Sequence, residues 1–65
     1  MSFKSARKAA NMTQTEAAIA LGVTQTAVAN WEAGLNNPTA ERLRRMAVIY
    51  RCTMEDLLKK DGRPT

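Results

Sequence analysis

The shortest connection in this chain places the strongest constraint on its fold, because only Gly22 and Val23 separate two short segments that both carry helix signals. The first segment opens with the Thr-Gln-Thr-Glu run of residues 13–16, which matches a capping box, and Gly22 suits the left-handed position that follows many helices. The second opens after Thr24, a good N-cap residue, and covers residues 25–32. Two short helices joined by so tight a turn cannot lie antiparallel. We therefore predict that they cross at a steep angle, as in a helix-turn-helix.

Three further segments also have helical spacing, and no stretch shows the alternation of a strand. Residues 2–10 place apolar side chains on one face, a segment follows the N-cap residue Thr39, and a last one runs from the cap Thr53 to Lys60. These patterns predict an all-α fold, a compact five-helix bundle, with residues 1–60 as a single domain and residues 61–65 as a flexible tail. The residues that the spacing places in the core are Leu21, Val23, Val28, Trp31, Leu43, Met46, Ala47 and Leu57.

The composition argues against an enzyme. The 65 residues are 45% hydrophobic but include one Trp, one Tyr and one Phe, enough for a small aliphatic core and too little for a catalytic cleft. Histidine is absent and Cys52 is the only cysteine, which removes the usual zinc ligand sets, a disulfide framework and Ser-His or Cys-His nucleophiles. We expect no catalytic residue, no metal site, no cofactor, no small-molecule ligand and no second module.

The charge balance points to a polyanionic partner. Ten Lys and Arg against six Asp and Glu give a net charge of +4, which suits either nucleic acid or an acidic membrane surface. The apolar runs are far shorter than the ~20 residues that span a bilayer, and residues 1–10 lack the apolar segment of a signal peptide. A cytoplasmic location without membrane insertion is therefore the expectation.

An ordered set of residues resembles the Cro/C1-type helix-turn-helix family. The resemblance spans about residues 3–58, and it implies a bundle of the lambda-repressor-like type that binds double-stranded operator DNA sequence-specifically as a dimer. It also suggests a small phage or mobile-element regulator, with repression by blocking polymerase as the simplest mechanism. The residues that carry it are Thr13, Gln14, Ala18, Leu21, Gly22, Val23, Thr24, Val28, Trp31, Glu32, Gly34, Pro38, Leu43, Ala47, Leu57 and Leu58.

Three positions depart from the family pattern. Ala6 and Ala17 stand where larger aliphatic residues are usual, and Arg51 occupies a position that is commonly glycine. These departures predict a lighter core around the first two helices and backbone strain at Arg51. We expect Ile19, together with Met12 and Trp31, to compensate for the missing volume.

The helix over residues 25–32 is the candidate reader of base sequence, because a helix fits the major groove and its N-terminal side chains meet base edges. Gln and Asn amides can bond adenine, and the methyl groups of Thr and Ala can contact thymine. The alternative is an ordinary solvated face. The expected base-contacting residues are Gln25, Thr26, Ala29 and Asn30.

Helix N-termini and one loop supply the expected phosphate contacts, since free amides and the positive dipole end favour an anion. The resemblance implies that Gln14 clamps the DNA backbone and that the loop before the fourth helix does likewise. We predict that Gln14→Ala weakens binding to all sequences about equally. The full predicted set is Gln14, Thr24, Asn36, Asn37, Arg42 and Lys8.

Two further sets concern structure and assembly. Arg7 and Glu32 match the family's interhelix ion pair, whereas Met54 and Leu58 form a stripe that one small core leaves partly uncovered and that two copies could bury. Other readings of the chain are a DNA-binding antitoxin of a toxin–antitoxin pair, a helical module for an acidic protein, and a basic amphipathic membrane binder. The helix-turn-helix spacing supports neither of the last two.

Overall fold

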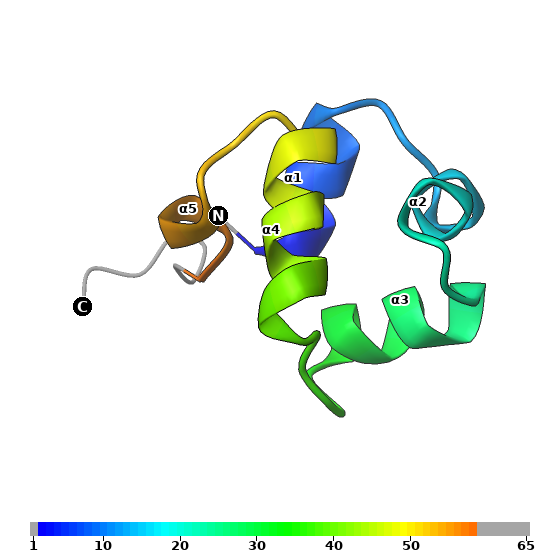
Figure 1. Cartoon of the computed structure of the whole chain (residues 1–65). Helices are drawn as coiled ribbons and strands as arrows, with labels where there is room; N and C mark the ends of the chain where they lie inside the picture. The colour runs from blue at the N-terminus through cyan, green and yellow to red at the C-terminus, as the bar shows by residue number, and fades with distance from the viewer. Residues whose placement is uncertain (1, 59–65) are drawn as a thin grey trace.

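The computed structural model describes residues 2–58 and contains five helices joined by short turns (Figure 1). No strand occurs within that range, so the predicted all-α fold is confirmed. Residues 59 and 60 of the fifth predicted helix and the predicted tail at 61–65 lie outside the described residues. The helices are α1 (Phe3–Ala9), α2 (Gln14–Leu21), α3 (Gln25–Ala33), α4 (Ala40–Ile49) and α5 (Met54–Leu58).

Side-chain hydroxyls cap the starts of these helices, because the first amides of a helix have no backbone partner. Thr13 Oγ1 accepts from the amide of Glu16 over 3.0 Å, and the Glu16 carboxylate accepts from the Thr13 amide over 2.8 Å, so the predicted capping box is present. Ser2 and Ser5 form a second box that the sequence pattern did not predict. The other hydroxyl caps are Thr24, Thr39 and Thr53.

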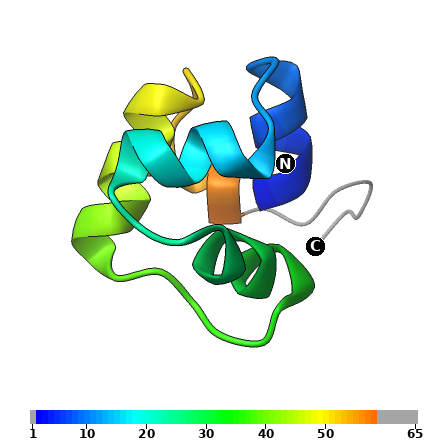
Figure 2. The same cartoon turned by 90° about the vertical axis from the view of Figure 1, so that its right-hand side faces the viewer.

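Helices α2 and α3 cross steeply, as the short connection of residues 22–24 requires. In Figure 1, α2 is seen end-on while α3 lies across the view, and after a quarter turn the two exchange these aspects (Figure 2). α2 also packs on α4, while α1 contacts α3 and α5, and α5 rests against α4. The arrangement leaves the N-terminal end of α3 at the edge of the molecule.

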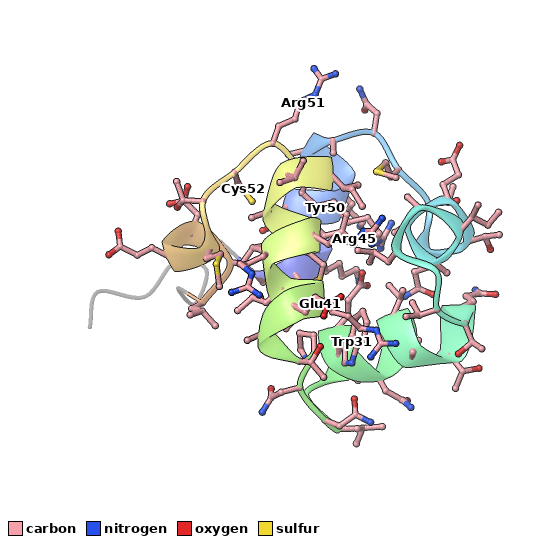
Figure 3. The ribbon with its side chains drawn as sticks, in the orientation of Figure 1. Trp31, Glu41, Arg45, Tyr50, Arg51 and Cys52 are labelled. Carbon is pink, nitrogen blue, oxygen red and sulfur yellow. The ribbon has the colours of Figure 1, made fainter. Side chains whose placement is uncertain are left out.

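Four helices end in the same hydrogen-bonding pattern, in which an amide reaches back to the carbonyl five residues earlier around a left-handed residue. After α2 and α3 that residue is glycine, with φ of 72° at Gly22 and 79° at Gly34. After α1 and α4 it is Asn11 and Arg51, both at φ 58°. Arg51 projects outward beyond α4 in Figure 3, and its strained backbone agrees with the expectation for this position. The closing bonds are Met12 to Arg7, Val23 to Ala18, Leu35 to Asn30 and Cys52 to Ala47.

The core lies where all five helices meet. Val28 and Met46 are its largest fully buried side chains, and Ala6 and Ala17 are completely buried. Because both of these buried side chains are single methyl groups, α1 and α2 contribute little side-chain volume to the core at these two positions. The remaining buried apolar residues are Ala18, Leu21, Trp31, Leu43, Ala47, Tyr50 and Leu57, with Val23 partly buried beside them.

The expectation that Ile19 helps to fill this core is wrong, because its side chain is 76% exposed. The inner face of α2 is formed by Ala17, Ala18 and Leu21. Ile19 lies two residues after Ala17, which on a helix is nearly the opposite side. Met12 is partly buried against the core and Trp31 is buried, as expected.

Candidate nucleic-acid interface

Helix α3 presents its N-terminal turn outward. Thr24 Oγ1 accepts from the Ala27 amide over 3.1 Å and fixes the start of the helix, while Val28 and Trp31 anchor its inner face in the core. Of the four residues predicted to contact bases, Gln25 and Thr26 are exposed, whereas Ala29 and Asn30 are half-buried. The four therefore share one helix but differ in how freely a base could reach them.

Arg7 and Glu32 join α1 to α3 through an ion pair. Arg7 Nε donates to Glu32 Oε2 over 2.7 Å and Nη2 donates to Oε1 over 3.2 Å, a two-pronged arrangement. The side chains are only 9% and 5% exposed. Arg7 Nη1 also donates to the carbonyl of Met12 over 2.8 Å, so the same guanidinium holds the turn that leads into α2.

Gln14 of α2 links this pair to the N-terminal turn of α3. Its Nε2 donates to Glu32 Oε1 over 3.0 Å, and its Oε1 accepts from Gln25 Nε2 over 3.4 Å. The structure thus brings together two residues predicted for different roles, Gln14 for a phosphate and Gln25 for a base. A continuous series of hydrogen bonds runs from Arg7 through Glu32 and Gln14 to Gln25.

The charge at the centre of this series is stable. Burial by itself would raise the pKa of Glu32, but the hydrogen bonds from Arg7 and Gln14 and the positive charge of Arg7 outweigh it and hold the pKa below its ordinary value of 4.5. The hydrogen bond with Glu32 raises the pKa of Arg7 in turn. Glu32 is therefore ionised at neutral pH and acts only as an acceptor.

The amide of Gln25 retains the groups that base recognition needs. Its NH₂ has two hydrogens, and the contact to Gln14 uses one of them. The second N–H and the carbonyl oxygen stay available on an exposed side chain. These are the donor and acceptor that a Gln presents to N7 and N6 of adenine.

The other residues predicted to contact phosphates are dispersed around this centre. Asn36 and Asn37 are exposed in the loop between α3 and α4, and Arg42 is exposed in the first turn of α4, where its amide donates to Thr39. Lys8 is exposed in the last turn of α1. No hydrogen bond found within residues 2–58 connects these side chains to Gln14 or Gln25.

Two features of this region were not predicted. The sequence analysis did not connect Gln14 with Glu32, although residues 18 apart on crossing helices could have been tested against the predicted turn. It also did not predict that Leu35, which follows the C-cap Gly34, would be 74% exposed. Among the described residues no cluster of metal-ligating side chains occurs, and no helix there has both the length and the apolar character needed to cross a membrane.

A helix-turn-helix family model matches residues 3–57 of the chain. No curated protein and no solved structure matches it. The matched range begins at the first residue of α1 and ends within α5, and it includes the whole hydrogen-bonded series from Arg7 to Glu32.

Proposed function

Because the chain belongs to the Cro/C1-type helix-turn-helix family, and so is a DNA-binding transcriptional regulator, we propose that it acts as a repressor that occupies an operator and blocks polymerase. The observation that supports this proposal best is the exposed Gln25 amide, held by Gln14 at the start of α3. A side chain that is already oriented loses less rotamer freedom when it binds a base. Repression by occlusion needs no further surface than the one that binds the operator.

In the proposed complex, the N-terminal turn of α3 enters the major groove. Gln25 bonds an adenine with its free N–H and carbonyl oxygen, and Thr26 offers a methyl group to a thymine. Ala29 and Asn30 lie about one turn further along α3 and contact the next base pairs. Base identity is thus read over a few consecutive positions.

The phosphate contacts of the complex come from several elements around α3. Thr24 and Arg42 stand at the starts of α3 and α4, where backbone amides and the helix dipole attract an anion. Gln14, Asn36, Asn37 and Lys8 complete the proposed set. Each phosphate that is neutralised by a cation should steepen the fall of log K with log salt by roughly 0.9.

Selection of binding sites from random duplexes, followed by transcription in vitro, tests the proposal. We expect a defined consensus, and we expect transcript to fall when the selected site overlaps the promoter and to stay unchanged when the site lies well upstream. Absence of a consensus would contradict sequence-specific binding. A consensus with undiminished transcript would contradict occlusion while leaving DNA binding intact.

We propose further that two copies bind a palindromic operator through the surface around Leu58. Leu58 is 64% exposed and Leu35 is 74% exposed, whereas Met54, the other residue of the predicted stripe, is partly buried against the core. α5 and the loop before α4 border one largely apolar hollow of about 360 Å³, whose lining includes Phe3, Trp31, Leu57 and Leu58. We therefore place the contact at Leu58, and the exposed Leu35, in the loop whose Gly34 and Asn37 border the hollow, is a second apolar residue that two copies could cover.

So small a patch falls well short of a standard protein interface, so the pairing should depend on DNA that holds both copies. Sedimentation on a palindromic duplex should show two chains per duplex, with the half-sites about one helical turn, ~34 Å, apart. A single chain on the full palindrome would contradict the dimer. If a co-encoded protein instead blocks this surface, the chain is better described as an antitoxin, which is the alternative function.

A further inference from the structure

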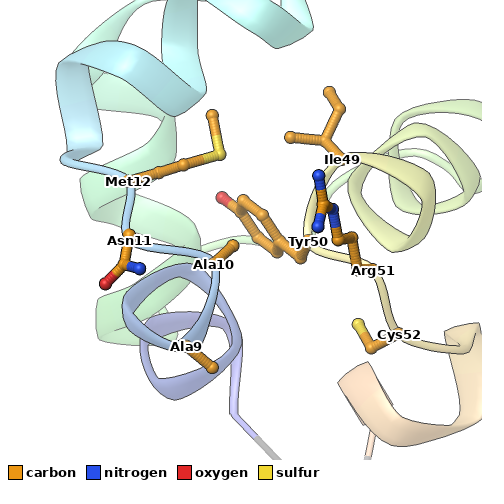
Figure 4. A pocket seen from close by; sticks show the side chains of 8 residues that line it. All are labelled: Ala9, Ala10, Asn11, Met12, Ile49, Tyr50, Arg51 and Cys52. Atoms are coloured by element: carbon orange, nitrogen blue, oxygen red, sulfur yellow. The ribbon is translucent and has the colours of Figure 1, made fainter.

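Two turns that are distant in the sequence border one cavity at the end of the bundle away from α3. The α1–α2 turn forms one wall, the α4–α5 turn forms the other, and the ring of Tyr50 lies between them (Figure 4). The cavity has a volume of about 600 Å³, within the range of pockets that hold small molecules. Its lining is Ala9, Ala10, Asn11, Met12, Ile49, Tyr50, Arg51 and Cys52.

The hydroxyl of Tyr50, in the lining of this cavity, is a buried polar group without a hydrogen bond among the described residues. Tyr50 is 3% exposed, and its Oη is the buried side-chain polar atom without a hydrogen-bond partner among the described residues. In Figure 4 it points between Met12 and Ile49, two residues of the cavity lining. A buried hydroxyl without a partner destabilises the fold, so a bound acceptor at this place would recover that loss.

Each wall also contains a residue with a left-handed backbone, and the conformational cost is greater for Arg51 than for Asn11. In the described part of the chain, Asn11 and Arg51 are the left-handed residues that are not glycine, and both line this cavity. Glycine ends α2 and α3, which shows that the same turn forms without a side chain. Strain of this kind is found where a side chain serves a purpose that glycine could not meet.

The charged side chain in the cavity lining, Arg51, favours an anion. α1 and α4 both end here, and each C-terminus contributes about half a negative elementary charge. Arg51 places a full positive charge in the lining itself, whereas Lys8 in the last turn of α1 and Asp56, whose charge raises the pKa of the Cys52 thiol, lie outside the lining and oppose each other. No acidic residue lines the cavity.

We propose that this cavity binds a small organic acid with a flat apolar body. The carboxylate would pair with the guanidinium of Arg51, and the apolar body would lie between Ala10 and Ile49, at the small exposed edge of Tyr50. Met12 has an unbranched, flexible side chain, and its movement would open the Tyr50 hydroxyl to an acceptor on the ligand. None of the lining residues comes from α3, so the ligand would leave the reading helix free.

Titration with benzoate, followed by two-dimensional amide NMR, tests the site, with benzamide and benzylamine as neutral and cationic probes of the same shape. We expect saturable shifts confined to residues 9–12 and 49–52, and binding of benzoate about tenfold tighter than of either other probe, as one charge-assisted pair provides. Shifts spread over the whole protein, or equal affinity for the three probes, would overturn the proposal.

Two variants separate the site from general charge effects. Arg51→Gly suits the left-handed backbone, so it keeps the fold, and it should weaken benzoate about tenfold while leaving benzamide unchanged. Arg44→Ala removes the same charge from an exposed position of α4 outside the cavity and should change benzoate affinity by less than about twofold. Equal losses in the two variants would show attraction by net charge alone and reject the site.

Discussion

The Nε2 atom of Gln14 donates to Oε1 of Glu32 over 3.0 Å, and this bond decides which end of the Gln14 amide faces Gln25. An ionised carboxylate only accepts hydrogen bonds, so the NH₂ group of Gln14 must face Glu32. The oxygen of Gln14 is left for the NH₂ of Gln25. A buried charge on the inner side of α3 thereby sets the orientation of an exposed amide on its outer end.

We predict that Gln25→Ala lowers affinity for the selected site by about 1–3 kcal/mol and relaxes the preference at one base pair, because the adenine contact is lost. Gln14→Ala should reduce that preference partially and weaken all sites, since it frees the Gln25 amide as well as removing a phosphate contact. This differs from the uniform weakening that the sequence alone suggests. Selection profiles of both variants measure it, and an unchanged profile for Gln25→Ala would refute base reading.

The Arg7–Glu32 pair should show strong coupling in thermal or chemical unfolding. Removing either partner leaves a buried charge unpaired, and we expect a loss of about 3 kcal/mol for Arg7→Met or Glu32→Gln. In the double variant the losses should not add. Additive losses would identify two independent charges. Arg44→Ala, an exposed arginine of α4, should change the free energy of unfolding by less than about 0.5 kcal/mol and serves as the control.

The Arg7–Glu32 pair should also make the free energy of unfolding decrease in acid. The pKa of Glu32 is lowered in the folded chain, so its contribution is fully present above the ordinary pKa of 4.5 and is lost as the pH falls through the folded value. The unfolding free energy of the wild type should therefore fall below that pH more steeply than that of Glu32→Gln. Parallel curves for the two proteins would contradict the pKa shift.

Tyr50 should remain neutral at unusually high pH. Burial, with a smaller effect from the charge of Glu32, raises its pKa from 10.0 to about 12. The neutral form is the one that the folded chain favours, so stability is full below pH 10.0 and falls as the pH rises toward about 12. Tyr50 is the only tyrosine, so ultraviolet absorbance of tyrosinate follows it alone. Ionisation with the ordinary pKa in the folded protein would refute the prediction.

Tyr50→Phe gives an independent check on the same hydroxyl. Because Oη has no partner within residues 2–58, its removal should leave the free energy of unfolding unchanged or raise it, by up to about 1 kcal/mol. A substantial loss of stability would show that the hydroxyl does have a partner in solution.

Glycine at the two strained turns should stabilise the chain unequally. A left-handed backbone costs an L-residue about 1–2 kcal/mol, and glycine loses part of this gain through the entropy of the unfolded chain. We expect Arg51→Gly to raise the unfolding free energy by up to about 1 kcal/mol. Asn11→Gly should gain less, because Asn tolerates this conformation. Chemical denaturation measures both, and equal destabilisation would contradict the backbone argument.

Leu58→Lys should reduce the cooperativity with which two half-sites are filled and leave binding to one half-site largely intact. The charge would disrupt the contact between copies without touching α3. Met54→Lys is a poor test, because Met54 packs against the core. Ile19→Lys places the same charge at another exposed apolar residue, outside the proposed contact, and should leave cooperativity unchanged. Unaltered cooperativity in Leu58→Lys would move the contact to Leu35 and its loop.

Local signals were enough to predict the five helices. Their starts follow from side-chain hydroxyls whose role depends only on residues three positions on, as between Thr13 and Glu16. The turn at Gly22 is also a local signal, because glycine favours the left-handed backbone that ends a helix, and the structure has this conformation there. Positions that depend on packing were harder to predict. Ile19 has a core-forming side chain, and only the place of its neighbours Ala17, Ala18 and Leu21 shows that it faces solvent.

For the candidate interface, the sequence predicted a set of contact residues but not the hydrogen bonds that connect them. Gln14 and Gln25 each have a clear position at the start of a helix, and either amide could have turned toward solvent. The crossing of α2 over α3 brings Gln14 within hydrogen-bond distance of both Glu32 and Gln25, a relation between residues 14, 25 and 32 that no short motif contains. The unpaired hydroxyl of Tyr50 was likewise beyond prediction, since its spacing on α4 indicates burial and says nothing of partners.

Helix α3 packs against the bundle with one face and exposes the other face to solvent. Val28 and Trp31 hold it in the bundle, while the outward residues at its N-terminal end take little part in packing. Substitutions at exposed positions such as Gln25 and Thr26 should therefore change the free energy of unfolding very little, so these positions can vary without loss of the fold. A lineage of such regulators could diverge to new operators while the bundle itself stays the same.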